Sequence, residues 1–182
     1  MEFKLAGLKL ELIRGDIASQ NDIEAVVNAA NAELRTGGGV AGAIHREAGP
    51  ELEKACRPLA PIEPGEAVIT KAFGLSNQYV IHTLGPVYGR DHPEAELLKK
   101  SYQNSLKLAE ESGIKSTAFP AISTGAFGYP IEKAAEVSLK SIKEMAPEIN
   151  NLRTIRFVLY SSRDLKIHQE QAQKIFKNNQ KN

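Results

Sequence analysis

Apolar and polar residues follow two different periods along the 182-residue chain. Short apolar runs of strand length recur, and stretches with the spacing of an amphipathic helix separate them. This alternation of strands and helices predicts an α/β domain. Six strands are expected, at residues 8–13, 25–27, 67–70, 79–83, 117–121 and 155–160.

Three longer stretches place apolar residues on one helical face. They are residues 94–112, residues 131–146 and the segment from about Asp164, and a shorter helix is expected near Val40. Gly113 follows the first stretch as a C′ residue, which ends a helix in the left-handed conformation. No repeat or linker interrupts the pattern, so we expect one domain over residues 1–176 and a solvated tail at 177–182.

Composition excludes several classes of protein. The chain carries 23 Lys and Arg against 22 Asp and Glu, for a net charge of +1, which argues against a nucleic acid partner bound through bulk charge. Its one cysteine, Cys56, cannot form an internal disulfide, and no export signal is visible, so we expect a cytoplasmic protein. No apolar run approaches the roughly 20 residues of a membrane-spanning helix, and no membrane association is expected.

A buried strand at residues 25–27 leads into a polar loop and then into three glycines, Gly37 to Gly39, which open the short helix. Glycine lets a ligand approach the backbone, and the amides of a first helical turn are unpaired donors. Together these features predict an anion site, most often for phosphate. Three glycines alone fit a flexible turn as well. The loop is not a Walker motif, because no Gly-Lys-Ser/Thr follows.

Residues 119–130 repeat this arrangement, since they leave a strand, pass two glycines and a hydroxyl pair, and enter a helix at Pro130. Ligands of open α/β sheets bind beyond the carboxyl ends of the strands, so the two loops are expected to hold two phosphates of one ligand. Phe127 lies between the two glycines. It fits either a ligand contact or a side chain that fills the core.

Four motifs in this order resemble the macrodomain family, which binds ADP-ribose, and are similar to its MacroD-type ADP-ribosyl hydrolases. They are Gly-Asp-Ile at 15–17, VVNAAN at 26–31, GGGVAGAIH at 37–45 and PAISTGAFGYP at 120–130. The similarity runs from about residue 8 to about residue 176. It implies a three-layer α/β/α sandwich with a mixed, mostly parallel central sheet of six strands or slightly more.

The resemblance also implies which residues bind adenine. Asp16 would accept a hydrogen bond from the adenine amine, because a carboxylate only accepts and the amine donates. Ile17 would offer its backbone beside Asp16, and Tyr160 would stack on the ring. Asp16 alone also fits a helix N-cap, and Tyr160 alone also fits an ordinary residue at a strand end.

The same resemblance places the diphosphate and the ribose beside the two glycine loops. Asn31 would contact the hydroxyls of the distal ribose, and Asn28 would support the loop by bonding to backbone. The loop residues that match are Gly38, Gly39 and Val40 in the first loop and Ser123, Thr124, Gly125, Ala126 and Phe127 in the second.

Hydrolysis is the open question. Similar enzymes usually read GGVDGAIH, whereas this chain has Ala41 in place of the aspartate. His45 matches, although it also fits a solvent-facing helix residue. We expect catalytic roles for Asn31, His45 and Phe127 and slow or moderate hydrolysis of ADP-ribosylated acidic side chains, O-acetyl-ADP-ribose or ADP-ribose 1″-phosphate. The alternative is a module that binds ADP-ribose without catalysis.

No cofactor or metal is expected. His82 and His92 are ten residues apart without Cys or carboxylate at a ligand spacing. Cys56 has no His near it in the sequence and no nucleophile signature, so it is interpreted as a core or surface thiol.

Overall fold

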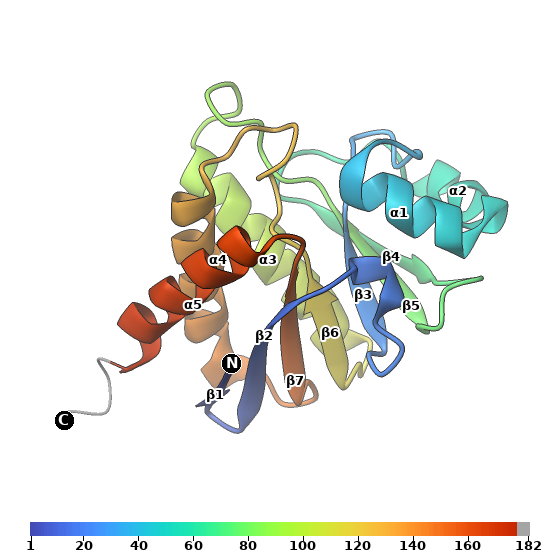
Figure 1. The fold of residues 1–182 in the computed structure, drawn as a ribbon. Coiled ribbons are helices and arrows are strands. Elements are labelled where there is room, and N and C mark those ends of the chain that lie inside the picture. The colour runs from blue at the N-terminus through green and yellow to red at the C-terminus, as the bar shows by residue number, and fades with distance from the viewer. Residues whose placement is uncertain (178–182) are drawn as a thin grey trace.

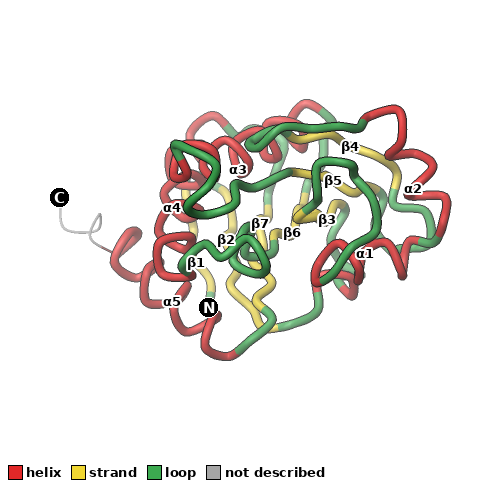
Figure 2. Tube along the Cα trace, turned by 90° about the horizontal axis from the view of Figure 1, so that it is seen from above, coloured by secondary structure: helices red, strands yellow, loops and turns green. Residues whose placement is uncertain are grey.

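The computed structural model describes residues 1–177. A mixed sheet of seven strands lies between two layers of helices (Figures 1 and 2). Its spatial order is β1 (Glu2–Leu5), β2 (Leu8–Arg14), β7 (Thr154–Leu159), β6 (Ser116–Phe119), β3 (Ala25–Ala29), β5 (Tyr79–Thr83) and β4 (Ala67–Lys71). The five central strands are parallel, and the two edge strands, β1 and β4, run antiparallel to their neighbours. The predicted α/β sandwich is confirmed.

Helices cover both faces of the sheet. On one face lie α1 (Gly39–Ala48) and α2 (Pro50–Cys56), and on the other lie α3 (Glu94–Glu111), α4 (Ile131–Met145) and α5 (Ser162–Lys177) (Figure 2). Short 3-10 turns are η1 (Ile17–Ser19), η2 (Arg57–Leu59) and η3 (Ala146–Glu148). Alternate residues of each strand point to opposite faces, so two apolar cores form, one under each helical layer.

All six predicted strands are present, with ends that differ by no more than two residues. The sequence missed β1, which pairs with β2 through a tight turn at Ala6 and Gly7, where φ is +48° and +88°. Turns of this kind are usually predicted from an Asn-Gly or Asp-Gly pair. The chain has Ala-Gly at these positions, so the turn was not predicted. β6 ends at Phe119, earlier than expected, because Pro120 has no amide hydrogen for the ladder.

The helix predictions hold with small shifts. α3 ends at Glu111, and Gly113 has the left-handed φ of +70° that its C′ assignment requires. Pro130, which was expected to be the first helical residue, is the N-cap of α4, so the helix begins one residue later, at Ile131. α2 was not predicted as a separate helix. Gly49, with φ of +81°, ends α1 and lets a new helix begin at once.

The predicted tail begins at Lys177, which is the last residue of α5, and its remainder, 178–182, lies outside the described residues. Within the described part of the chain, no helix is both long and apolar enough to cross a membrane.

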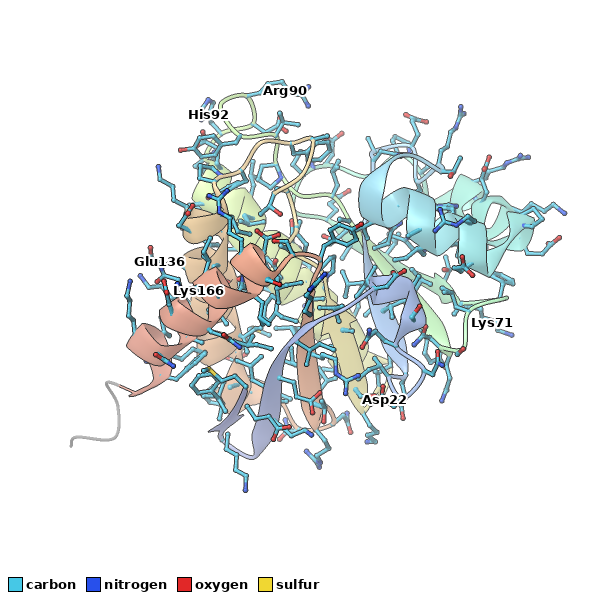
Figure 3. The ribbon with its side chains drawn as sticks, viewed as in Figure 1. Asp22, Lys71, Arg90, His92, Glu136 and Lys166 are labelled. Carbon is cyan, nitrogen blue, oxygen red and sulfur yellow. The ribbon has the colours of Figure 1, made fainter. Side chains whose placement is uncertain are left out.

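Because five strands are parallel, their carboxyl ends meet at one edge of the sheet. The loop that follows β5 carries Arg90 and His92 at its tip (Figure 3). Its base is joined to the loop that follows β6, because the Tyr88 amide donates to the Phe127 carbonyl at 2.9 Å. The two loops therefore hold each other in place over this edge.

A buried polar cluster lies between the sheet and α2. The Asn28 amide donates to Nδ1 of His82 at 3.1 Å, and Nε2 of His82 lies 3.0 Å from the Thr70 hydroxyl and 3.6 Å from the Cys56 sulfur. The expectation that Asn28 bonds to backbone is therefore wrong, and the fold brings to Cys56 a histidine that is distant in sequence. Burial lowers the pKa of His82 to about 3 and raises the pKa of Cys56 to about 11, so both are neutral at pH 7.

Acid should destabilise the fold through His82. The pKa of an unfolded histidine is about 6.5. Below that pH, His82 is protonated in the unfolded chain and stays neutral in the folded chain. The free energy of unfolding should be highest above pH 6.5 and fall by at most about 1.4 kcal/mol per pH unit toward the folded pKa of about 3. Urea titrations between pH 7.5 and 5 measure this slope. His82→Gln should make the slope shallower, and the remainder comes from His45 and His168, whose pKa values burial also lowers. His92→Gln, at an exposed histidine, should leave the slope unchanged. A slope that His82→Gln leaves unchanged would contradict the assignment.

Candidate functional site

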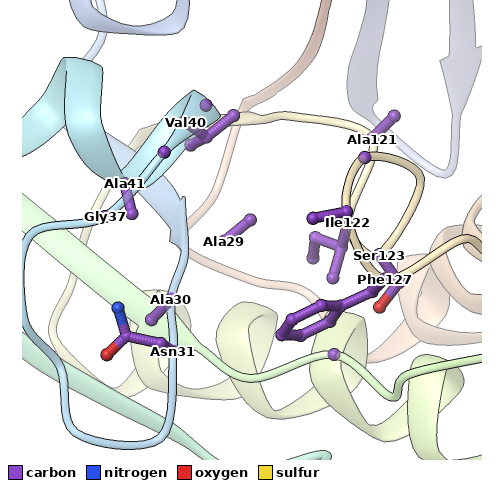
Figure 4. Close-up of a pocket in the computed structure, with 15 residues that line it drawn as sticks. Ala29, Ala30, Asn31, Gly37, Val40, Ala41, Ala121, Ile122, Ser123 and Phe127 are labelled. Carbon is purple, nitrogen blue, oxygen red and sulfur yellow. The ribbon is translucent and has the colours of Figure 1, made fainter.

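A cavity of about 290 Å³ opens at the carboxyl ends of β3, β5 and β6 (Figure 4). Four segments line it: the end of β3, the glycine loop with the start of α1, the loop after β5, and the loop after β6. The lining residues are Ala29, Ala30, Asn31, Gly37, Gly38, Gly39, Val40, Ala41, Gly85, Ala121, Ile122, Ser123, Gly125, Ala126 and Phe127. None of these side chains is titratable at neutral pH. The cavity therefore offers main-chain groups and small side chains instead of charges.

The glycine loop presents the amino end of α1 to this cavity. Gly38 is the N-cap, and the first helical hydrogen bond runs from the Gly42 amide to the Gly38 carbonyl at 3.3 Å. The amides of Gly39, Val40 and Ala41 consequently have no acceptor within the helix. The positive end of the helix dipole adds to these donors, so the loop suits an anion.

The loop after β6 is a tight turn that also presents main-chain amides. Ser123 has a φ of +67°, its carbonyl accepts from the Tyr129 amide at 2.9 Å, and the Gly125 carbonyl accepts from Gly128 at 3.0 Å. The Thr124 hydroxyl donates to the Ala121 carbonyl at 2.8 Å. Thr124 therefore stabilises the turn and is absent from the cavity lining, unlike its predicted neighbours Gly125 and Ala126.

Asn31 and Phe127 lie across the cavity from each other, with the Phe127 ring pointing toward Asn31 (Figure 4). The Asn31 amide donates to the Arg35 carbonyl at 2.8 Å, and its oxygen accepts from the Arg35 amide at 3.0 Å. These bonds fix the side chain and leave it one N–H and one lone pair for a ligand. Phe127 is half-buried and packs on the core under α1 as well as lining the cavity, so the core-filling interpretation describes part of its environment.

The sequence matches the family model described as "Macro domain" over residues 27–138. The chain belongs to the macro domain family. It is 48% identical to a macro domain-containing protein of Chlorobaculum tepidum, over 88% of this chain and 94% of that protein. It is 46% identical to a protein of Salmonella typhimurium named O-acetyl-ADP-ribose deacetylase, over 88% of this chain and 92% of that protein.

Solved macro domains share the fold as well. The macrodomain of Oceanobacillus iheyensis with ADP has a TM-score of 0.93 and 38% identity, and the match covers 98% of this chain and 97% of that one. The Trypanosoma brucei macrodomain in complex with ADP-ribose has a TM-score of 0.82 and 34% identity, over 90% of this chain and 68% of that one. The family predicted from four motifs is confirmed.

In this macro domain His45 does not line the main cavity. It lies on α1 and lines a second cavity, together with Thr36, Arg46, Gly49, Pro50 and Glu53. Its ring is buried, its centroid is 6.4 Å from that of His82, and burial lowers its pKa. The structure therefore separates His45 from Asn31 and Phe127, with which the sequence had grouped it.

The residues predicted to bind adenine lie beyond the cavity lining, at the ends of two neighbouring strands. Asp16 follows β2 and caps η1, with its Oδ1 accepting from the Ala18 amide at 2.9 Å, and Ile17 is buried behind it. Tyr160 follows β7 and is 87% exposed. The Gly15 amide donates to the Leu159 carbonyl at 3.0 Å, which joins the two strand ends. The N-cap interpretation of Asp16 is correct, and capping leaves its Oδ2 available.

Within residues 1–177, no group of three or more His, Cys, Asp or Glu side chains is arranged to hold a metal ion.

Sequence analysis missed Gly85, which lines the cavity after β5. A Cβ on Gly85 would overlap the Ser123 hydroxyl and press on Ile122, so only glycine lets the two loops approach this closely. The Gly-Pro pair at 85–86 signalled the end of a strand, but nothing in the sequence indicated which residue would pack against it.

Gly85→Ala should lower the free energy of unfolding by about 1–3 kcal/mol, the usual cost of overpacking. Gly125→Ala is the matched control in the same cavity, because a Cβ there meets no atom within 4 Å and its φ is not in the left-handed region. Denaturant titration compares the two. Equal stabilities for the two variants would contradict the close contact.

Proposed function

We propose that this macro domain binds ADP-ribose and hydrolyses acyl esters on its distal ribose. The substrates are O-acetyl-ADP-ribose and proteins ADP-ribosylated on acidic side chains. ADP-ribose 1″-phosphate is a related substrate, in which a phosphate ester takes the place of the acyl ester and water releases phosphate instead of a carboxylic acid. One observation carries the proposal: two loops at one sheet edge line a cavity that holds Asn31 and Phe127, and the amides of residues 39–41 and 125–127 in these loops have no main-chain acceptor within the described residues. The relative named O-acetyl-ADP-ribose deacetylase supports the reaction type.

The diphosphate binds to the main chain of Gly38, Gly39 and Val40 on one side and of Ser123 to Phe127 on the other. Backbone donors at a helix start need no lysine or arginine to hold an anion. This explains how a chain with a net charge of +1 takes a dianionic ligand into a cavity lined without charged side chains.

Adenine binds at the neighbouring strand ends. Oδ2 of Asp16 accepts from the exocyclic amine, Ile17 offers its backbone, and the Tyr160 ring stacks on the base. The exposure of Tyr160 supports this assignment, because a tyrosine that is 87% exposed has its ring face open to a ligand. Stacking of this kind is worth about 1–3 kcal/mol.

In the hydrolysis step a water oxygen forms a bond to the acyl carbon, the bond from that carbon to the ribose oxygen breaks, and a carboxylic acid and a ribose hydroxyl result. Asn31 orients the ribose and the water through its remaining N–H and lone pair, and Phe127 orients the sugar. No side chain in the cavity can act as a general base, which typically contributes about 10²–10⁴ in rate. Turnover should therefore be slow and confined to labile esters.

His45 stays outside the group that contacts substrate. Its burial beneath α1 and its place in the second cavity support a role in holding α1, the helix whose first turn binds phosphate.

A second candidate function is ADP-ribose binding without catalysis. Ala41 favours it, because the methyl group stands in the cavity where similar enzymes have a carboxylate.

Titration calorimetry should give ADP-ribose a Kd in the micromolar range or tighter, which corresponds to about −8 kcal/mol. Asp16→Ala should weaken ADP-ribose by roughly tenfold, since it removes one hydrogen bond to a charged acceptor. Ribose 5-phosphate, which lacks the base, is the control ligand and should bind both forms alike. An equal loss for both ligands would remove Asp16 from the adenine site.

Ala41→Asp should raise the kcat for acetate release from O-acetyl-ADP-ribose by about tenfold or more, because it adds a carboxylate at the substrate. Ala43→Asp, on the same helix but outside the cavity lining, is the matched control and should leave kcat unchanged.

Asn31→Ala should lower kcat more than it lowers affinity. Absence of turnover in the wild-type chain, with intact ADP-ribose binding, would establish the binding-only function instead.

A further inference from the structure

A cluster of charged and polar side chains lies under the segment that connects β2 to β3. Its centre is Arg156 of β7, whose side chain is only 13% exposed. The guanidinium donates to both carboxylate oxygens of Asp22 at 2.8 Å and to Glu11 at 2.6 Å. Figure 3 shows Asp22 near the start of β3.

The ionisable side chains of the cluster are charged at neutral pH. The hydrogen bond to Asp22 raises the pKa of Arg156, which stays protonated at all relevant pH. Burial alone would raise the pKa of Glu11, but hydrogen bonds from Lys9 and Arg156 outweigh it and lower the pKa. Arg156 and Lys9 carry two positive charges, and Glu11 and Asp22 carry two negative charges. The charges of these four side chains therefore balance, and Gln20 adds none.

Gln20 is the member of the cluster that reaches the predicted adenine site. Nη1 of Arg156 donates to the Gln20 side-chain oxygen at 3.0 Å, and the Gln20 side-chain nitrogen donates to the Asp16 carbonyl at 2.7 Å. The guanidinium has only donors and the carbonyl only accepts, so the orientation of the Gln20 amide is fixed from both ends. The residue is 6% exposed, and the Asn77 amide holds its main-chain carbonyl at 2.8 Å.

The turn that carries Asp16 is short and is held from two sides, because the Gly15 amide donates to the Leu159 carbonyl and Ile17 is buried in the core under α1. η1 has three residues, and its internal bonds are those from the Ala18 amide to Oδ1 of Asp16 and from the Ser19 amide to the Asp16 carbonyl at 3.1 Å. The Gln20 side chain adds a second donor to that same carbonyl. It thereby links the main chain of Asp16 to the sheet through the largely buried guanidinium of Arg156, and this link is independent of the capping bond.

We propose that Gln20, held by Arg156, is a positioning residue that sets the orientation of the Asp16 carboxylate and with it the preference for adenine over bases that lack the 6-amino group. This inference rests on the proposed function of Asp16. Gln20 itself does not touch the ligand. It acts through the Asp16 main chain, so its effect should appear in the choice of base.

The test compares ADP-ribose with inosine 5′-diphosphoribose, in which a carbonyl replaces the amine, by titration calorimetry on the full chain. Gln20→Glu keeps the size and the acceptor for Arg156 but loses the donor to Asp16. Gln20→Met loses both bonds. Gln103→Glu, the same chemical change on α3, is the matched control. Thermal unfolding of each variant confirms that it folds at the temperature of the titration.

The wild-type chain and Gln103→Glu should bind ADP-ribose about tenfold tighter than the inosine analogue, the worth of one hydrogen bond to a charged acceptor. In both Gln20 variants the ratio should fall toward one, with affinity for the inosine analogue kept within about twofold of the wild type. A ratio that persists in a folded Gln20 variant, or an equal loss of both ligands, overturns the role of Gln20 and leaves Asp16 in place. A wild-type chain that does not distinguish the two ligands overturns the adenine assignment itself.

Discussion

The parallel alignment of five strands is the constraint on which the rest of this macro domain depends. It brings the ends of β3, β5 and β6 to one edge, where the following loops turn sharply and leave main-chain amides without internal acceptors. Each such amide would be costly to bury unpaired. The edge therefore stays open as a cavity. Polar main-chain groups and small side chains line it.

Much of this arrangement could be predicted from the chain alone, because it rests on local signals. Periodicity located the strands, and the glycines that follow two of them located both loops that line the cavity. What escaped prediction depends on contacts between distant residues. The approach of Gly85 to Ser123, the pairing of His82 with Asn28 and the position of His45 in the second cavity all follow from packing.

The sequence motifs and the structure also group His45 with different residues. The resemblance grouped His45 with Asn31, because the motif GGGVAGAIH at 37–45 follows VVNAAN at 26–31 closely along the chain. A helix has 3.6 residues per turn and rises about 1.5 Å per residue, so residues four apart face the same way but lie about 6 Å apart along the axis. Ala41, in the first turn of α1, lines the main cavity, and His45, one turn further along the same face, lies beyond that cavity and near His82.

A binding site made of main-chain donors responds to substitution in an unusual way. Truncating a side chain to alanine removes no amide, so an alanine scan of the two loops would find few sensitive positions outside Asn31 and Phe127. Adding atoms has the opposite effect, because Gly42 lies against the Gly37 carbonyl and Gly85 against Ser123. The shape of this site depends most on its glycines, which have no side chain to truncate.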